Sequence, residues 1–387
     1  MTSNSTKMVA SDFEFERQLG TGAFSKVVVG RYKPTGQRYA VKLISKRSIL
    51  NAPTDEERAR MADVARRESR MLLLCEHPNI VRFYQSMQTT EDLVYVTELC
   101  DGGELLDHIA RLGKVPLEAA RYATAELLSA VFYLHYGTKR AVGNTPAKAS
   151  TLIHRDLKPE NIMLSADKHV KLIDFGTAVI TDSVHDKSEE KDNSQGRAQT
   201  FCGTTYYMSP ELFQDNYTCC ASDYWGCGCV LYHMLLGKRP FDAATQYLLI
   251  KSILEQEPEY PPDLDPDAKD LIQKLLVKSP EKRISMEDMK KHPFFAVVNF
   301  DTLSATRVEG LWVKETPWVD ESSVIACQHC NKAFGMFTQK DYCRRCGLVL
   351  CEKCVSTKLS IPSYRVQEPQ QICRQMCQSS LLETEEQ

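Results

Sequence analysis

The sequence predicts an α+β fold over residues 13–295, followed by a small zinc-stapled module near the C-terminal end. Three observations lead to this prediction. Alternating and apolar runs typical of strands come first, and longer stretches with apolar residues at helical spacing follow them. Eight cysteines then cluster between Cys327 and Cys377. The chain therefore contains a mixed globular part and a separate cysteine-rich part.

Length, composition and charge are those of an ordinary globular chain. A length of 387 residues predicts two or three domains, and 43% apolar with 26% charged residues is typical of such proteins. The formal net charge of -3 argues against a nucleic-acid partner, which usually requires a basic excess. No apolar run is long enough to span a membrane, and residues 1–10 lack the apolar core of a signal peptide. We therefore expect a cytoplasmic protein.

The first predicted strands flank a glycine-rich turn. We expect residues 1–12 to be disordered, a strand over residues 13–19, a break at residues 20–25 (GTGAFS) and a second strand from residue 26. Glycines let the backbone approach a phosphate and offer it N–H groups, so Gly20 and Gly22 are candidate nucleotide-binding residues. Glycine-rich hairpins without such a function are common, and this turn alone is weak evidence.

Lys42 lies within an alternating apolar strand at residues 38–44, where an unpaired ammonium would be costly. From residue 61 to residue 75 apolar side chains recur at helical spacing, and Glu68 falls on that stripe. A carboxylate on an apolar helix face complements a lysine on an apolar strand, so we expect an ion pair between Lys42 and Glu68. The alternative is that Glu68 is a solvated member of the charged run 66–70.

Residues 154–161 (HRDLKPEN), together with a second acid beyond a predicted hairpin, carry the strongest chemical pattern. Asp156 can accept a hydroxyl proton. It is followed, in an order suited to holding metal-bound ATP, by Lys158, Asn161 and Asp174. Each motif alone has an ordinary explanation, because an aspartate after an arginine can be a turn residue and Asp-Phe-Gly can be a plain loop. Their order and context together favour a phosphoryl-transfer site.

Other polar residues in the same part of the chain are expected to be structural. Asp223 opens the most apolar predicted helix and should be a buried acid bonded to the backbone of residues 154–161. Arg283 should form an ion pair with Glu211. Residues 138–151 are small, polar and basic, which predicts a loop insertion.

A mobile segment is predicted at residues 181–198, which are polar, charged and poor in apolar side chains. Thr200 follows this segment and is the candidate phosphosite, because Arg155 offers a guanidinium that a phosphate could engage. The alternative is that Thr200 is one of several loop hydroxyls without a special role; the others are Ser183, Ser188 and Ser194.

Residues 13–295 resemble serine/threonine protein kinases of the AGC group and, within it, the 3-phosphoinositide-dependent kinases. The motifs that carry the resemblance are HRDLKPEN at 154–161, whose Lys158 marks Ser/Thr kinases, DFGTA at 174–178, QTFCGT at 199–204 and Ser209 in Ser-Pro-Glu. The resemblance implies a two-lobed protein kinase fold that uses ATP and Mg²⁺. Since none of the family's catalytic residues is missing, it also implies an active enzyme.

The resemblance assigns roles to individual residues. It implies that Asp156 orients and deprotonates the acceptor hydroxyl, and that Lys158 neutralises the transferred phosphoryl group. Lys42 and Glu68 belong to the catalytic set. Asn161 and Asp174 would hold Mg²⁺ on the phosphates. Glu98 and Cys100 belong to the hinge, whose backbone is implied to meet the adenine. The implied nucleotide-binding residues are Gly20, Gly22, Val27, Ala40, Lys42, Glu98, Cys100, Glu104, Asn161 and Asp174.

The same resemblance implies protein substrates, namely activation segments of other AGC kinases and the chain's own segment. It also implies a docking pocket on the small lobe that includes Lys46 and Leu50, although the phosphate-binding side chains of that pocket are not matched around residues 66–69. Two alternatives stay open. One is a kinase of another Ser/Thr branch with different substrates, and the other is a zinc-domain adaptor whose kinase fold is only a scaffold.

The cysteine-rich part, residues 321–378, contains four cysteine pairs with metal-ligand spacing. Eight thiolates satisfy two tetrahedral Zn²⁺ ions, and a segment with so small a core needs such staples to fold. Spacing alone leaves the pairing open, but the short gap between the second and third pairs favours interleaved sites. The expected ligands are Cys327, Cys330, Cys351 and Cys354 on one ion, and Cys343, Cys346, Cys373 and Cys377 on the other. A disulfide framework is the alternative, which a reducing compartment disfavours.

The motif CRRCG at residues 343–347, with Trp318 upstream, resembles a FYVE-type zinc finger, a family that binds phosphatidylinositol 3-phosphate. The family's basic run corresponds here to residues 339–344 (QKDYCR), which keep Arg344 but lack both histidines. The fold therefore transfers better than the lipid specificity. A RING-type ubiquitin ligase is the other interleaved zinc fold; it normally uses a histidine ligand, whereas His329 is expected to be a spectator.

A membrane surface is one candidate partner of this module. A basic patch and an apolar tip at residues 336–337 would suit phosphoinositide-containing endosomal or other membranes, and the patch comprises Lys340, Arg344, Arg345 and Lys353. The alternative is that these side chains serve only packing and solubility. We expect residues 296–320 to be a linker anchored by Trp312 and Trp318, and residues 379–387 to be an acidic tail.

Overall fold

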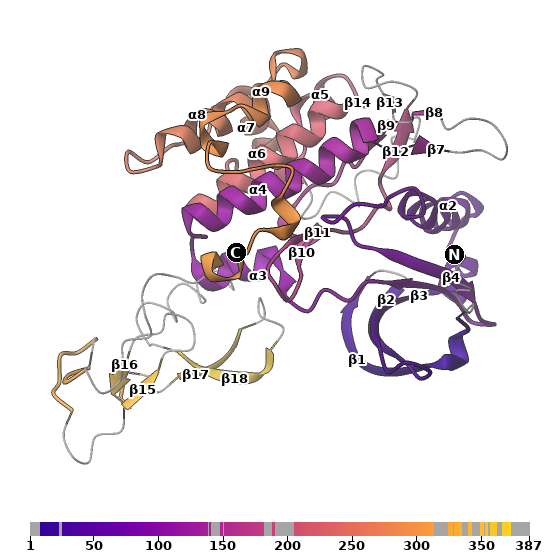
Figure 1. Ribbon diagram of the computed structural model, residues 1–387, viewed down its shortest axis with the longest axis horizontal. Helices are drawn as coiled ribbons and strands as arrows, with labels where there is room; N and C mark the ends of the chain where they lie inside the picture. The colour runs from indigo at the N-terminus through magenta and orange to yellow at the C-terminus, as the bar shows by residue number, and fades with distance from the viewer. Residues whose placement is uncertain are drawn as a thin grey trace.

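The computed structural model describes residues 8–22, 25–137, 139–140, 148–149, 151–181, 188–189 and 205–312 and, near the C-terminal end, residues 324–327, 329–334, 340–342, 349–351, 353–354, 357–361 and 366–372. Figure 1 shows a sheet-rich small lobe formed by the first strands and a helical large lobe formed by the later helices. The predicted two-lobed α+β fold is confirmed.

The small lobe is built on a five-stranded antiparallel sheet in the order β1-β2-β3-β5-β4. Val41 and Val96 lie opposite each other in adjacent strands and are fully buried, as suits β-branched residues on a pleated surface. The strands are β1 (Phe13–Thr21), β2 (Ser25–Tyr32), β3 (Arg38–Ser45), β4 (Phe83–Gln88) and β5 (Asp92–Thr97).

Two helices, α1 (Lys46–Leu50) and α2 (Asp55–Leu72), follow β3. Ala65 of α2 packs in a cluster with Tyr95, whose hydroxyl donates to the Ala65 carbonyl at 2.6 Å. The helix begins at Asp55, well before the residue 61 at which its apolar pattern starts. Thr54 caps this end, because its Oγ1 accepts the N–H of Glu57 at 3.1 Å. The first turns are polar and therefore gave no periodic signal.

The chain leaves the small sheet at Thr97, the last residue of β5. Residues 98–100 then cross toward the large lobe without strand structure, although the apolar run of β5 continues through Leu99 and Cys100. The N–H of Glu98 donates to the Arg82 carbonyl at 2.8 Å, and the N–H of Gly102 donates to the Leu164 carbonyl of the large lobe at 2.9 Å. A Cβ at Gly102 would lie 2.1 Å from the Ser165 carbonyl oxygen, so only glycine fits this crossing.

The large lobe packs around two long helices, α4 and α6. Gly226 lets α6 approach the stretch 154–161, since a Cβ there would lie 2.8 Å from the Cβ of Leu157. The α4 helix ends in a π-helical turn, Tyr133–Gly137. The helices are α3 (Leu105–Leu112), α4 (Leu117–Phe132), α5 (Pro210–Gln214), α6 (Cys220–Leu236), α7 (Gln246–Glu255), α8 (Pro266–Leu275) and α9 (Met286–Lys290).

Short strands of the large lobe hold the polar residues that the sequence singled out. Strands β11, β10 and β6 form a three-stranded sheet in that order, and β9 pairs with β12. The stretch 154–161 lies between β9 and β10, and Asp174 lies between β11 and β12. The strands are β6 (Gly103–Glu104), β9 (Thr151–Ile153), β10 (Ile162–Leu164), β11 (Val170–Leu172) and β12 (Val179–Thr181).

Two segments expected to be loops contain paired strands. In the insertion 138–151, β7 (Lys139–Arg140) pairs with β8 (Lys148–Ala149), which corrects the prediction of a plain loop. In the polar segment 181–198, β13 (Ser188–Glu189) pairs with β14 (Tyr217–Thr218). These short pairings depend on backbone hydrogen bonds, so neither the hydrophobic pattern nor the strand propensity of the side chains predicted them.

The first part of the predicted linker packs on the large lobe. Leu303, Val308 and Trp312 are buried, and the Trp312 ring contacts the ring of His108 in α3, with 5.4 Å between centroids. Trp312 therefore anchors this stretch, as expected. Trp318, the other expected anchor, lies outside the described residues.

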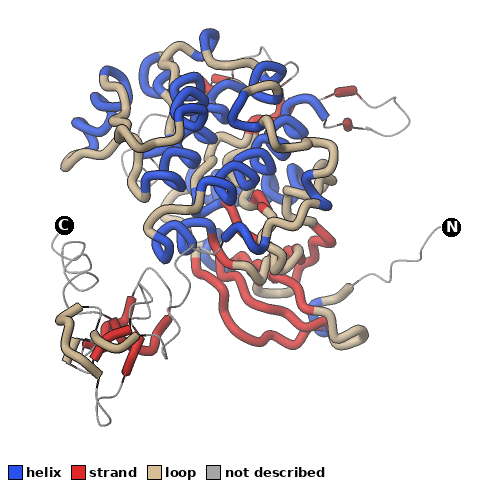
Figure 2. The backbone as a smooth tube through the Cα atoms, turned by 60° about the vertical axis from the view of Figure 1, so that its left-hand side comes forward, coloured by secondary structure: helices blue, strands red, loops and turns tan. Residues whose placement is uncertain are grey.

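The C-terminal module contains two hairpin-like pairs of strands, shown in red in Figure 2. Strand β15 (Lys340–Tyr342) pairs with β16 (Val349–Cys351), and β17 (Thr357–Ile361) pairs with β18 (Val366–Ile372). No helix in the described part of the chain is long and apolar enough to cross a bilayer.

A fully buried ion pair ties α5 to the end of the large lobe. Arg283 contacts both carboxylate oxygens of Glu211, at 2.8 and 2.6 Å, as the sequence predicted. Its remaining N–H groups donate to the carbonyls of Val277, Ala221 and Lys278, so all five guanidinium donors are used. Burial alone would raise the pKa of Glu211, but the Arg283 guanidinium and the Ser222 hydroxyl hold it below its ordinary value.

We expect Arg283→Met to lower the free energy of unfolding by about 3–5 kcal/mol, because it leaves the Glu211 carboxylate buried without its cation. Denaturant-induced unfolding measures the change. Lys238→Met is the matched control, since the Lys238–Glu259 pair is solvent-exposed and should contribute little. Equal losses for the two variants would contradict the importance of the buried pair.

Candidate active site and metal site

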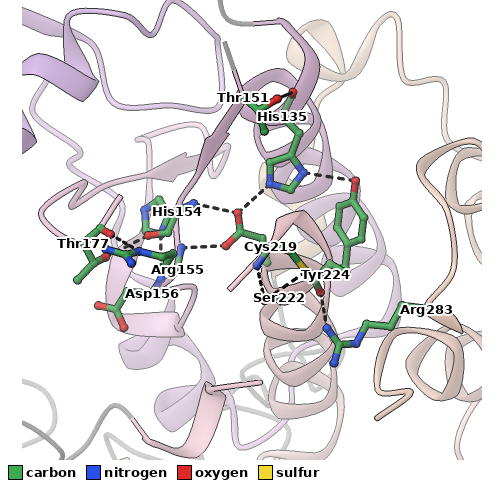
Figure 3. A network of polar contacts seen from close by, with 12 residues as sticks. His135, Thr151, His154, Arg155, Asp156, Thr177, Cys219, Ser222, Tyr224 and Arg283 are labelled. Atoms are coloured by element: carbon green, nitrogen blue, oxygen red, sulfur yellow. Dashed lines mark hydrogen bonds and ion pairs between the residues drawn. The ribbon is translucent and has the colours of Figure 1, made fainter. Parts of the chain in front are cut away.

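The stretch 154–161 begins with a strained turn. Arg155 has a φ of 71°, in the left-handed region that non-glycine residues rarely adopt. The Asp223 carboxylate holds this turn, because it accepts the backbone N–H groups of His154 and Arg155, each at 2.9 Å. Figure 3 shows the network around these residues. The sequence predicted this bonding of Asp223, and the structure confirms it.

His135 completes the support of Asp223. Its Nε2 lies 2.8 Å from Asp223 Oδ2, and both side chains are almost fully buried. Burial alone would raise the pKa of Asp223, but the contacts with His135 and the His154 backbone hold it below its ordinary value. Asp223 is therefore an anionic anchor inside the lobe. Sequence reasoning missed His135, which falls at the end of a helical pattern and shows no sign of a distant acidic partner.

Two polar side chains of the stretch 154–161 converge on the Asp156 carboxylate. Lys158 Nζ and Asn161 Nδ2 both donate to Asp156 Oδ2 at 2.8 Å. Asn161 Nδ2 also bonds the Asp156 carbonyl at 2.8 Å. The structure thus brings together Asp156, Lys158 and Asn161 as the sequence analysis expected, with the Asp156 side chain oriented by two donors.

Asp174 projects from the end of β11 in a second left-handed turn. Its φ is 60°, and its Oδ1 accepts the N–H of Gly176 at 3.1 Å. The next residue, Phe175, is fully buried against the His154 ring, with 5.0 Å between ring centroids. The Asp174 side chain itself lies exposed. Strained backbone conformations of this kind cluster at functional sites when the surroundings hold them in place.

Thr177 ties the two strained turns together. Its hydroxyl donates to the His154 carbonyl at 3.0 Å, and its own carbonyl accepts the Arg155 Nε at 2.6 Å. Figure 3 shows Thr177 beside His154 and Arg155, with these contacts as dashed lines. The positions of Asp156 and Asp174 are therefore linked through hydrogen bonds and not only through the chain. Thr177 was not predicted to have a role beyond its place in DFGTA.

The ion pair between Lys42 and Glu68 is present. Lys42 Nζ lies 2.6 and 2.7 Å from the two carboxylate oxygens, and Glu68 is buried. Burial alone would lower the pKa of Lys42, but the carboxylates of Glu68 and Asp174 outweigh it and raise the pKa above its ordinary value. Lys42 is thus a cation stabilised by two carboxylates, that of Glu68 on α2 and that of Asp174 in the large lobe.

The glycine-rich hairpin and the adjoining strands bring several predicted nucleotide contacts together. Gly20 pairs with Val27 across β1 and β2, and Val27 in turn pairs with Lys42 on β3. Gly22 closes the described part of the turn, with its N–H donating to the Ser25 carbonyl at 2.7 Å. Ala40 lies on β3 opposite Thr97 at the end of β5.

The hinge residues lie between the two lobes. The Glu98 side chain bonds Lys171 of β11, which leaves the Glu98 backbone for the expected contact. Cys100 packs partly against the core of the large lobe, and burial raises the pKa of its thiol to about 12. Glu104 lies on β6, paired with Met163 of β10.

The donors of this site fit a magnesium nucleotide. The exposed carboxylate of Asp174 is an oxygen ligand of the kind that Mg²⁺ prefers. Asn161 uses its amide nitrogen on Asp156, so its amide oxygen is the atom suited to a metal. Lys42 supplies a cation, and the hairpin supplies backbone N–H groups. The arrangement can hold a triphosphate and present a carboxylate, that of Asp156, to an acceptor hydroxyl.

Four cysteines in the C-terminal module form a metal-type cluster. The sulfur atoms of Cys327, Cys330, Cys351 and Cys354 all lie within 4.8 Å of one another. The Cys330–Cys351 and Cys351–Cys354 sulfur distances are 3.8 and 3.6 Å, near the roughly 3.8 Å expected for thiolates around a tetrahedral zinc ion. These four are free thiols, which disfavours the disulfide alternative. The structure thus brings together the four cysteines that the sequence analysis grouped on one ion.

Several predicted site residues lie outside the described residues. They are the second expected zinc set, the candidate phosphosite, the apolar tip and two arginines of the basic patch: Cys343, Cys346, Cys373, Cys377, Thr200, Met336, Phe337, Arg344 and Arg345.

The chain belongs to the protein kinase family, whose protein kinase domain matches residues 13–295. A FYVE zinc finger matches residues 317–383. Both resemblances that the sequence motifs suggested are confirmed, since the chain carries a protein kinase domain and a FYVE zinc finger.

Curated relatives share the kinase part. The chain is 36% identical over 295 residues to serine/threonine-protein kinase ksg1 of Schizosaccharomyces pombe, covering 75% of this chain and 47% of that protein. It is 36% identical over 298 residues to 3-phosphoinositide-dependent protein kinase 1 of Homo sapiens, covering 76% and 49%. The protein of that name in Arabidopsis thaliana is 35% identical over 297 residues, covering 76% and 56%. The chain spans about half the length of these relatives.

We expect Cys351→Ser to reduce bound zinc by about one ion per chain, because four thiolates complete a structural tetrahedral site. Elemental analysis of the purified chain measures the content. Cys75→Ser is the control, since the Cys75 thiol donates to the Met71 carbonyl at 3.2 Å in the kinase domain, outside the zinc module. Unchanged zinc content in Cys351→Ser would contradict the assignment of this cluster.

Proposed function

We propose that this protein transfers the γ-phosphoryl group of ATP to serine or threonine hydroxyls of other proteins. The observation that carries the proposal is the convergence of Lys158 and Asn161 on the Asp156 carboxylate, beside a strained turn that presents Asp174. Loose phosphoryl transfer depends on positioning and on charge stabilisation, which such a set provides.

In this proposal each residue acts through one atom or charge. Asp156 orients the acceptor hydroxyl and takes its proton. The Lys158 ammonium, 2.8 Å from Asp156, offsets negative charge on the transferred group. Lys42, held by Glu68, pairs with the nucleotide phosphates, while Asn161 and Asp174 provide the oxygen ligands for Mg²⁺, which neutralises charge on the phosphates when bound.

We propose activation segments of AGC-type kinases as the substrates. Relatives at 36% identity named 3-phosphoinositide-dependent protein kinase 1 support this, and so does the chain's own segment QTFCGT at 199–204, which resembles such a target. Thr200 is the corresponding site of self-modification, with the Arg155 guanidinium as the candidate phosphate partner.

We expect phosphoryl transfer from labelled ATP, with Mg²⁺, to favour AGC activation-segment peptides over a generic basic peptide. Asp174→Asn is the blank, because it removes a metal-binding carboxylate but keeps the shape of the side chain. Equal or reversed preference would leave a kinase of another Ser/Thr branch. Transfer that persists undiminished in Asp174→Asn would contradict the assigned site, and a chain inactive on every peptide would favour an adaptor role.

We also propose that the zinc module holds two Zn²⁺ ions and directs the chain to membranes that contain a phosphoinositide. The FYVE match supports this, as does Lys340 of β15, which pairs in register with Cys351 of the cysteine cluster. The residues 339–344 lack the histidines of the family's basic run, so headgroup selectivity is the weaker part of the proposal.

We expect the full chain to sediment with vesicles containing phosphatidylinositol 3-phosphate and much less with vesicles of neutral lipid alone. Lys340→Glu should weaken the binding, because juxtaposed basic residues supply attraction to anionic lipids. Lys238→Glu on the kinase domain is the matched charge control. No difference between the two kinds of vesicle would leave protein binding as the role of the module.

A further inference from the structure

One carboxylate joins three separate elements where the two lobes meet. Glu98 follows β5 at the hinge, and its Oε2 accepts the N–H of Arg82 at 3.2 Å while its own N–H donates to the Arg82 carbonyl at 2.8 Å. Lys171 Nζ, on β11 of the large lobe, lies 2.8 and 3.0 Å from the two oxygens of Glu98. The hinge is thus tied to the chain between α2 and β4 and to β11.

Strand β11 is itself bonded to both neighbouring parts of the site. The N–H of Leu172 donates to the Asn79 carbonyl at 2.9 Å, and the Leu172 carbonyl accepts the N–H of Val81 at 3.0 Å. The N–H of Ile173 donates to the Asn161 carbonyl, also at 2.9 Å. A side chain that fixes β11 to the hinge therefore relates the adenine end of the site to the end that carries Asn161 and Asp174.

The Glu98–Lys171 pair is shielded from solvent far more than an ordinary surface ion pair, so its loss should change the local geometry. The side-chain exposures are 25% for Glu98 and 15% for Lys171, whereas in the control pair on the large lobe they are 59% for Lys238 and 88% for Glu259. Partly buried charges that keep their partner hold one geometry, but a carboxylate that loses its cation seeks water and moves. Without Lys171, the Arg82 N–H would be the one remaining hydrogen-bond partner of the Glu98 side chain within the part of the chain that the structure describes.

We propose that Lys171 is a positioning residue for nucleotide binding: through Glu98 it holds the hinge backbone at a set distance from β11, so that adenine and phosphate contacts are made together. The kinetic test of this proposal rests on the proposed function, because it measures the KM for ATP. The affinity for nucleotide is measured without turnover and provides an independent test. Lys171 touches no reacting atom in this account, and it acts only through the geometry of Glu98.

The test compares Lys171→Met, Glu98→Gln and the double variant with the native chain. We expect Lys171→Met to raise the KM for ATP about tenfold, as the loss of one charge-assisted hydrogen bond would, with kcat changed less than about twofold. The Kd for Mg²⁺-ADP, measured by calorimetry, should rise by the same factor. Glu98→Gln keeps the shape of the hinge residue and should give a similar effect.

The double variant separates positioning from general stability. Because both single changes break one link, the double variant should resemble either single one, instead of multiplying their effects. Lys238→Met serves as the control and should leave both constants unchanged. A lowered unfolding midpoint in Lys171→Met with an unchanged Kd for Mg²⁺-ADP would overturn the proposal and leave the pair as structural. If the native chain binds Mg²⁺-ADP but transfers phosphate to peptides only weakly, that result would count against the proposed function and not against this inference.

Discussion

The geometry of the active site depends on one buried carboxylate, that of Asp223. An ion at this depth is tolerated only when every oxygen has a donor, and here His135 and two backbone N–H groups provide them. The same bonds hold Arg155 in a left-handed turn directly before Asp156. The strain of that turn is sustained by the helix that carries Asp223.

The site is assembled from a small number of charged contacts between elements that are otherwise joined by apolar packing. Lys42 meets Glu68 between strand and helix, and Lys171 meets Glu98 between the lobes. Glu211 and Arg283 form a buried pair within the large lobe. Apolar surfaces slide and repack at low cost, but a paired ion has few alternative partners, so these contacts specify relative position more sharply than packing does.

The sequence predicted features whose chemistry is local. Asp156, Lys158 and Asn161 lie within six residues, and the cysteine pairs fall at ligand spacing, so both groups could be recognised before any fold was known. The Lys42–Glu68 pair could be inferred because each charge interrupts an apolar pattern. Element boundaries were less predictable: the polar first turns of α2 gave no periodic signal, and Leu99 with Cys100 extended the apolar run of β5 beyond its last sheet hydrogen bond at Thr97.

Residues whose role arises only from tertiary contact could not be found in this way. His135 and Lys171 sit in ordinary helix and strand patterns, and their partners lie 88 and 73 residues away along the chain. Thr177 likewise acts through backbone groups that carry no residue-specific signature.

The long sequence separation between Asp223 and the turn that it holds has a consequence for how the protein acquires activity. The Arg155 N–H and its acceptor are 68 residues apart, so the turn lacks its main restraint until α6 has been synthesised and docked. Closing such a loop is entropically slow compared with forming a helix. During refolding, the recovery of catalysis should therefore follow the late consolidation of the large lobe, after most helical signal has returned.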